Sequence, residues 1–320
     1  MKSKNTLLLL VVLLVVAGAA YYLFKQKDRK STIAGPDSEF AVTDTAAVDK
    51  IFISTKDGRN HTLVRKGEGQ WMIDNKYEAR QDMVNMLMET INKMRMKKPV
   101  SNASRNNVIR TLGARGIKVE VYKNNQLAKQ FYVGGTTSDD LGTYFIMQGS
   151  ENPYVVHIPG FDGFLESRFD MHLKDWRRVP VFHSAPASIE QLTVKYNKNP
   201  EQNFTIVNTP NGFDVKELPQ EDQETIKRYL MNYVNVNGEF FVPDMHGQMR
   251  DSLELLTPVY EITLKDREAA RSNSIKLYRN PDTEDRMLGI TSQFNEVMSV
   301  QDYVLRHLLV DKEHFKGNNK

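Results

Sequence analysis

The sequence lacks the features that would assign it to a familiar class of protein. It contains no cysteine, which excludes disulfide bonds, zinc–thiolate sites, iron–sulfur clusters and cysteine nucleophiles. Neither sign of charge prevails: there are 43 lysines and arginines against 40 aspartates and glutamates, and a net charge of +3 is too small to indicate nucleic-acid binding. A mean hydropathy of -0.51 excludes a polytopic membrane protein, and a hydrophobic share of 40% excludes a mostly disordered chain.

Sequence motifs of common enzymes are also missing. The chain has no HExxH, GxSxG, GxxxxGK or GxGxxG pattern, so the motifs indicate no zinc protease, α/β-hydrolase, P-loop or dinucleotide site. We therefore predict no catalytic residue, no cofactor and no metal. A length of 320 residues is enough for one large or two small domains.

One long apolar run is present, at the N-terminus. Residues 6–24, which begin at Thr6 and end at Phe24, carry no charge, and basic residues lie on both sides of them. As a helix this run would be about 28 Å long, close to the hydrocarbon thickness of a bilayer. The sequence therefore predicts one transmembrane helix, which contacts the lipid bilayer within an N-terminal anchor segment, 1–30.

A cleaved signal peptide is the alternative for this segment. Lys2 and Lys4 provide a basic start, and cleavage after Ala19 would follow a small-residue pattern. Apolar residues continue to Phe24, which favours an uncleaved anchor, and both alternatives export the rest of the chain. The four basic residues within 25–30 oppose export by the positive-inside rule, whereas the signal-like start and very short preceding tail favour it. We predict a single pass in the inner (cytoplasmic) membrane, with the soluble part on the periplasmic side.

Turn signals and short apolar runs divide the remaining chain. Gly35-Pro36 interrupts a polar stretch that is typical of a tether, and short β-like runs follow, separated by turns such as Asp57-Gly58. The predicted segments are a tether over 31–45, a first domain over 46–180, a second domain over 185–312 and a polar tail over 313–320.

The order of elements recurs along the chain. Ile51 matches Leu192 at an offset of 141 residues, and Trp71 matches Phe213 at an offset of 142. Four further elements match at offsets of 140 to 143. A nearly constant offset through six elements predicts an α+β fold made of two tandem pseudo-repeats of antiparallel sheet with packed helices.

An amphipathic helix is predicted over 82–96, because apolar residues recur there at helical spacing. Lys93, Arg95, Lys97 and Lys98 gather at its end. Cations at a helix C-terminus complement the helix dipole and usually face solvent, so we prefer that interpretation to a phosphate contact.

Polar groupings that could carry chemistry are weak. The double glycine Gly134-Gly135, with Thr136 and Thr137, could form an anion-binding nest, although a turn is the more common structure for such a pair. Two further groupings are His172 and His183 near Asp170 and Asp175, which could bind a metal, and the adjacent carboxylates Asp139 and Asp140. We interpret both as surface patterns, because neither spacing requires its members to converge.

Three residues at the junction of the repeats stand out: Trp176, Arg177 and Arg178. Exposed tryptophan and arginine often anchor a binding partner. A tryptophan between two domains more often fills their seam. We predict a partner contact or an inter-repeat contact here.

Several stretches together carry a resemblance: FAVTDTAAVDKIFIS, GQWMIDNKYEAR, KVEVYKNNQLAKQFYVGGTTSDDLGTYFIM, PYVVHIPGFDGFLESRF and DWRRVPVF. The chain resembles bacterial proteins of the DUF 4340 family, a domain of unknown function. The resemblance implies one N-terminal membrane segment, an envelope location and, from some relatives, a role beside ABC-type transport or gliding machinery. It implies no catalytic residue.

Two classes of function follow. The first is an exported, membrane-anchored, non-catalytic binding module of the bacterial envelope, whose partner is another envelope protein such as an ABC-type transporter component, and which binds no nucleic acid. The second is a hydrolase or ligand-binding protein with a dispersed site at the repeat interface, since dispersed sites leave no motif. A pocket with converging carboxylates or histidines would favour the second class.

Overall fold

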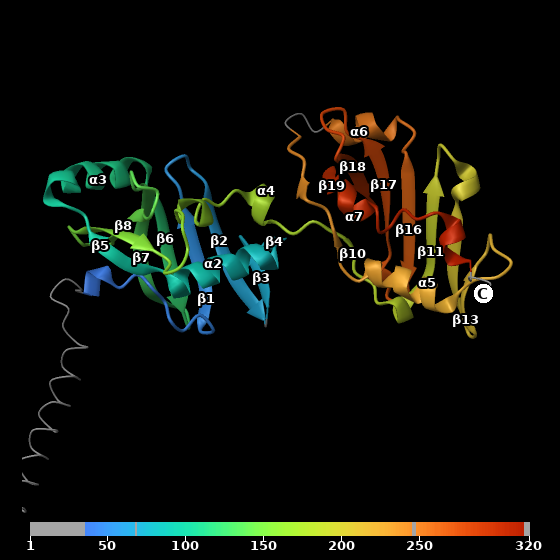
Figure 1. Cartoon of the computed structure of the whole chain (residues 1–320), viewed down its shortest axis with the longest axis horizontal. Coiled ribbons are helices and arrows are strands. Elements are labelled where there is room, and N and C mark those ends of the chain that lie inside the picture. Colours follow the sequence, from blue (N-terminus) through green and yellow to red (C-terminus); the bar gives the residue numbers. More distant parts are fainter. Residues whose placement is uncertain (1–35, 68, 245–247, 317–320) are drawn as a thin grey trace, which may run out of the picture. The chain divides into compact units, whose positions relative to one another are not determined.

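The computed structural model of the protein describes residues 36–67, 69–244 and 248–316 (Figure 1). Two large antiparallel sheets and few helices confirm the predicted α+β class. The predicted membrane segment, 6–24, lies outside the described residues. Within the described ranges, no helix is both long and apolar enough to cross a bilayer.

The chain divides into two units at boundaries that differ from the predicted ones. The first unit ends at Met171, and the second contains 172–320 together with the short excursion Tyr77–Arg80. The reason is local pairing: the amide of Arg80 donates to the carbonyl of Trp176, and the amide of Arg178 donates to the carbonyl of Glu78. Residues 172–180 therefore belong to the second unit and not, as predicted, to the first.

Within the first unit, the strands of the large sheet follow the order β3-β2-β1-β6-β7-β8-β9-β5. Its elements are η1 (Pro36–Ser38), β1 (Val48–Ser54), β2 (Asn60–Gly67), β3 (Gln70–Ile73), α2 (Gln81–Lys93), β5 (Arg95–Pro99), α3 (Asn102–Arg115), β6 (Ile117–Lys123), β7 (Gln126–Thr136), β8 (Thr143–Met147), β9 (Pro153–His157) and η2 (Glu166–Arg168).

The second unit has a large sheet with the order β13-β12-β11-β16-β17-β18-β19-β15 and a small one, β10-β14. Its elements are β4 (Tyr77–Glu78), α4 (Leu173–Trp176), β10 (Pro180–Phe182), η3 (Pro186–Ser188), β11 (Ile189–Tyr196), η4 (Pro200–Gln202), β12 (Phe204–Thr209), β13 (Gly212–Val215), α5 (Gln223–Leu230), η5 (Met231–Tyr233), β14 (Val236–Asn237), β15 (Phe240–Phe241), α6 (Met249–Glu254), β16 (Tyr260–Asp266), η6 (Ala269–Arg271), β17 (Asn273–Arg279), β18 (Arg286–Thr291), β19 (Met298–Gln301), α7 (Asp302–Leu305) and η7 (Lys312–Phe315).

The eight strands that each unit contributes to its large sheet follow the same order when they are matched in order of appearance. They also share an irregularity. The register of β1 against β6 shifts between Val48 and Lys50, and the register of β11 against β16 shifts between Ile189 and Gln191, which are the positions 141 residues later. The regular pairing is therefore interrupted at corresponding positions of the two sheets, as at a β-bulge.

Helices cover both faces of the second large sheet. On one face, Ile226 and Leu230 of α5 are fully buried in the larger of two apolar clusters. On the other face, Leu253 of α6 joins a smaller cluster with Tyr278 and Leu288. The two clusters lie on opposite faces because neighbouring strand residues point in opposite directions: Leu277 belongs to the larger cluster and Tyr278 to the smaller one.

Three boundaries predicted within the units are wrong. The helix predicted over 82–96 ends at Lys93, and the basic residues after it lie on strand β5. The predicted tether contributes to the core of the first unit, because Phe40 is buried with its ring 5.4 Å from that of Phe145. The predicted polar tail contains Phe315, which is fully buried in the second unit.

Candidate functional site

The candidate site of the second unit is built around Arg177. This residue follows α4 and forms an isolated antiparallel bridge with Ala79. The pairing holds Trp176 in the interior, with 1% of its surface exposed, and leaves Arg177 only 8% exposed. A nearly buried arginine requires a carboxylate and further polar or aromatic partners to offset its lost hydration.

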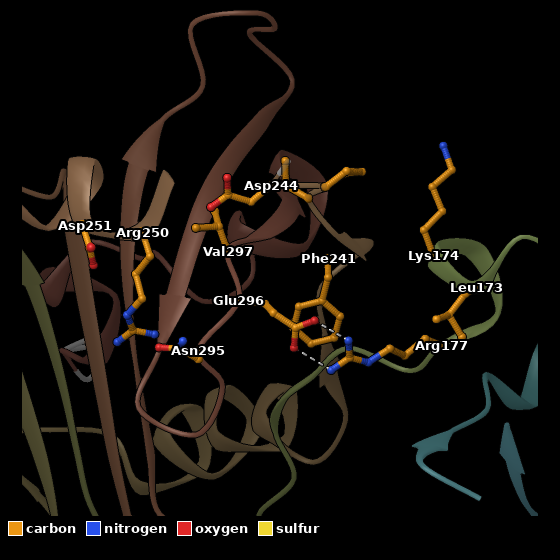
Figure 2. Close-up of a pocket in the computed structure, with 12 residues that line it drawn as sticks. Leu173, Lys174, Arg177, Phe241, Asp244, Arg250, Asp251, Asn295, Glu296 and Val297 are labelled. Atoms are coloured by element: carbon orange, nitrogen blue, oxygen red, sulfur yellow. Dashed lines mark hydrogen bonds and ion pairs between the residues drawn. The ribbon is translucent and has the colours of Figure 1, made fainter. Parts of the chain in front are cut away.

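Arg177 has these partners. Its guanidinium lies 4.0 Å from the ring centre of Tyr77 and 3.8 Å from that of Phe241. Its two terminal nitrogens donate to both carboxylate oxygens of Glu296, at 2.6 and 2.9 Å, as the dashed lines of Figure 2 show. We call these four residues the Arg177 cluster. Stacking and bidentate pairing together fix both the plane and the direction of the side chain.

A cavity of about 400 Å³ lies beside the Arg177 cluster (Figure 2). Its wall contains apolar side chains from three segments, which include Leu173, Phe241 and Val297. The full lining is Leu173, Lys174, Arg177, Phe241, Val242, Pro243, Asp244, Arg250, Asp251, Asn295, Glu296 and Val297. This volume lies within the range of small-ligand and side-chain pockets.

The charges around the cavity are partly neutralised. Arg250 pairs with Glu254 at 2.9 Å and donates to the carbonyl of Phe294 at 2.7 Å, so it is held against the wall. Lys174 and Asp251 are exposed at the opening. The cavity therefore combines an apolar wall with a rim of both charges, which suits recognition of a polypeptide segment better than that of a purely apolar ligand.

The other residues predicted at this junction behave differently from one another. Trp176 is buried and offers no surface to a partner in this structure. Arg178 is half-buried, and it pairs with Glu78 at 2.7 Å and lies 2.8 Å from a ring nitrogen of His183. Of the three, only Arg177 reaches the cavity.

Lower pH is expected to destabilise the second unit through His183. Partial burial and the neighbouring Arg178 cation lower the pKa of His183 from its usual 6.5. The unfolded chain therefore takes up the proton first, so the contribution of the neutral ring to stability is complete above pH 6.5 and declines as the pH falls toward the folded pKa. The stability of the second unit can be measured by urea unfolding, monitored by hydrogen exchange and mass spectrometry, at several pH values between about 7.5 and 5.

The variant His183→Gln should show a shallower loss of stability over the same pH range. His157→Gln is the matched control, because His157 also has a lowered pKa but lies in the first unit. Equal pH dependence of the second unit in His183→Gln and in the unchanged protein would contradict the assignment.

The double glycine of the first unit forms neither a nest nor a turn. Gly134 and Gly135 are strand residues of β7, and neither has the positive φ that a nest requires. A Cβ on Gly134 would lie 2.7 Å from Cδ2 of Leu112, which is 3% exposed, and 3.3 Å from the carbonyl oxygen of Tyr144. The missing side chain lets α3 approach the sheet closely.

Gly134→Ala is therefore expected to destabilise the first unit by about 1–3 kcal/mol through overpacking. The neighbouring helix offers a matched control: a Cβ on Gly113 meets nothing within 4 Å, so Gly113→Ala should stabilise by about 0.5–1 kcal/mol. Hydrogen exchange of first-unit peptides in urea measures both. If Gly134→Ala left the free energy of unfolding unchanged, α3 could shift without loss of stability.

The remaining predicted groupings are surface features. Asp139 lies in the turn after β7, where Thr137 and the amide of Leu141 donate to it and hold its pKa below the usual value. Asp140 has the left-handed φ of 55°, typical of a turn. Among the described residues, no group of three histidines or carboxylates could hold a metal ion, so His172 and His183 do not form a site with Asp170 and Asp175 there.

Sequence reasoning missed most of the site. Glu296 is 119 residues from Arg177, and Phe241 comes from a two-residue edge strand. Neither carries a local signal, because their only shared property is the fold that brings them together.

Comparison with known proteins gives one match. A family model described as Domain of unknown function (DUF4340) covers residues 71–244, more than half of the chain, and confirms the resemblance noted in the sequence. No curated protein and no solved structure matches the chain.

Proposed function

This chain belongs to the DUF4340 family, whose function is unknown, and we propose that it is a membrane-anchored, non-catalytic binding module of the bacterial envelope. In this proposal the segment 6–24 anchors the protein in the inner membrane and the two units lie on the periplasmic side. The second unit then holds a segment of another envelope protein in the cavity beside the Arg177 cluster.

The observation that carries the proposal is the fixed wall of this cavity. Arg177 and Arg250 are each held by a carboxylate, and Phe241 is stacked, so the wall is ordered before any ligand arrives. Pre-ordered contacts reduce the entropy lost on binding. The lining has no histidine, serine, threonine or tyrosine. Of its three carboxylates, Glu296 is bound to Arg177, Asp244 accepts from the amide of Met249, and Asp251 is exposed, as Lys174 is. This arrangement supports binding over acid–base or nucleophilic catalysis at this place.

The two units share a fold but differ beside the cavity, which supports a binding role for the second unit. We infer that the units are copies of one α+β unit, because their large sheets share strand order and a bulge. They also share a hydrogen bond: Arg105 donates to the carbonyl of Glu151 in the first unit, and Arg250 donates to the carbonyl of Phe294 in the second. The copies differ in the length of the helix that carries this arginine: α3 has 14 residues, and α6 has 6.

The partner we propose is a component of an ABC-type transport or gliding system, as the family resemblance implies. A tether to the bilayer supports this role, because it raises the local concentration of the module near membrane partners.

Site-specific photocrosslinking in cells tests the binding role. A photoreactive amino acid at Asp251, on the rim, should capture one defined membrane protein, and Asn295→Trp, which places bulk in the opening, should abolish the crosslink. Lys276→Trp is the control, since Lys276 is exposed on β17 and does not line the cavity. A crosslink that survives Asn295→Trp would exclude the cavity, and turnover of a substrate by the purified protein would favour the alternative of an enzyme.

Fusion reporters test the topology separately. Alkaline phosphatase joined after Thr32 should be active, and a green fluorescent protein joined there should be dark. The reverse pair of results would place the units in the cytoplasm.

A further inference from the structure

Basic residues are concentrated in one stretch of the first unit. Residues 93–118 contain eight lysines and arginines and no aspartate or glutamate, although the whole chain has a net charge of only +3. Six of these cations lie on β5 or α3: Arg95, Lys97, Lys98, Arg105, Arg110 and Arg115. We call these six residues the basic face, although its three α3 arginines stand five residues apart and therefore point in different directions around the helix.

The fold turns these cations outward. Strand β5 is the last strand of its sheet, and helix α3 buries Val108 and Leu112 against the sheet. Lys98, Arg110 and Arg115 are exposed. Figure 1 shows α3 lying across the end of the sheet that carries β5.

Few carboxylates offset this charge. Arg105 pairs with Glu151 at 3.2 Å, and Lys97 and Lys98 lie near enough to Asp139 to help lower its pKa. The other contacts are to uncharged groups: Lys97 donates to the carbonyl of Leu141, Arg95 to two backbone carbonyls, and Arg110 to the side chain of Asn107. A carbonyl or amide orders a cation without neutralising it, so the basic face keeps a positive potential.

The second unit shows that the fold does not require this charge. The elements in the same topological positions are β15, which has no charged residue, and α6, in which Arg250 is outnumbered by Asp251 and Glu254. The excess of cations is thus particular to the unit that follows the predicted anchor.

The described chain also begins beside the basic face. Asp37 of η1 accepts hydrogen bonds from Ser150 at 2.8 Å and Asn152 at 3.4 Å, and Arg105 donates to the carbonyl of the intervening Glu151. Residues 25–35 can extend over about 40 Å at most. The anchor proposed above would therefore keep this end of the first unit within reach of the bilayer surface.

We propose that the basic face binds the anionic phospholipid headgroups of the membrane that holds the anchor. This inference rests on the anchor of the proposed function, but on neither its cavity nor the side of the membrane, since both leaflets can carry anionic lipid. Clustered lysines and arginines next to a membrane segment are attracted to such headgroups over about one Debye length, about 8 Å at physiological salt.

Energy transfer to lipid tests the proposal on the full-length protein. Because the chain has no cysteine, Asn106→Cys places a single donor dye on an exposed position of α3. The protein is reconstituted in nanodiscs of phosphatidylcholine, with or without roughly equal phosphatidylglycerol, that contain a headgroup-labelled acceptor. We expect roughly twofold higher transfer with phosphatidylglycerol and loss of the difference at about 0.5 M salt.

Charge reversal gives the matched comparison. Arg110→Glu with Arg115→Glu should abolish the dependence on phosphatidylglycerol. Lys195→Glu with Arg279→Glu changes the net charge equally at exposed positions of the second unit and should preserve the dependence. Circular dichroism shows whether each variant is folded, and the single variants Arg110→Gln and Arg115→Gln replace a pair that fails to fold.

The outcomes separate the two proposals. Protein that stays with nanodiscs in high salt but shows equal transfer in both lipids overturns the basic face and leaves the anchor intact. Protein that leaves the nanodiscs in high salt overturns the anchor and this inference together. Equal transfer in both lipids, with tight binding of a labelled single-stranded oligonucleotide, would assign the basic face to nucleic acid instead.

Discussion

Phe315→Ala is expected to lower the free energy of unfolding of the second unit by about 3–5 kcal/mol. The Phe315 side chain is fully buried, and its ring centre lies 5.1 Å from that of Phe204 and 5.0 Å from that of Tyr229. Alanine would remove this apolar surface and leave a cavity between two rings that are themselves held by the sheet and by α5. Such a site collapses poorly, which places the cost in the upper part of the range for large-to-small changes.

The backbone around Phe315 makes local rearrangement costly. The amide of Asp222 donates to the carbonyl of Phe315 at 2.8 Å. Upstream, the buried hydroxyl of Tyr229 donates to the carbonyl of Leu308 at 2.6 Å, and that of Tyr196 donates to the carbonyl of Val310 at 2.7 Å. The C-terminal segment is thus fixed at several points, so the vacated space cannot be filled by a simple shift of the chain.

Hydrogen exchange of second-unit peptides in urea measures the effect within the intact protein. Glu313→Ala is the control, because Glu313 is exposed and its ion pair with Lys316 lies at the surface, where such pairs contribute about 0–1 kcal/mol. First-unit peptides should be unaffected in both variants. A loss below about 1 kcal/mol in Phe315→Ala would show that the segment is only loosely attached.

Phe315 also shows where prediction from sequence ends. Local signals suffice for some elements. Alternating apolar residues from Ile117 predict a strand, which forms as β6, and the pair Asn124-Asn125 predicts a turn, where both asparagines have positive φ. Phe315 stands alone among polar residues, and a single aromatic residue has no periodicity. Its burial depends on rings that are far away in the sequence.

The candidate site could likewise be predicted only in part. Arg177 was selected from sequence because it stands with Trp176 between two similar halves. Its partners Glu296 and Phe241 could not be found, because only the folded second unit brings them into contact with Arg177. Repeat offsets predicted the order of elements, but they say nothing of the places where two copies differ.

Arg177→Ala is expected to destabilise the second unit by about 2–4 kcal/mol, because two ring contacts and a bidentate ion pair are lost together. Arg177→Lys should recover little of this. An ammonium keeps the charge, but it cannot lie flat between Tyr77 and Phe241 while donating to both oxygens of Glu296. The control is Arg271→Ala, whose pair with Glu268 is exposed and should contribute less than about 1 kcal/mol.

A double-mutant cycle with Glu296→Ala isolates the ion pair from the stacking. We expect a coupling energy of about 1–3 kcal/mol between Arg177 and Glu296, since the arginine is nearly buried although the carboxylate is half exposed. Stacking would remain as the residual effect of Arg177→Ala in the Glu296→Ala background. Additive effects of the two changes would mean that the pair contributes nothing, and Arg177 would then be held by the aromatic rings alone, leaving the wall of the cavity free to move with Glu296.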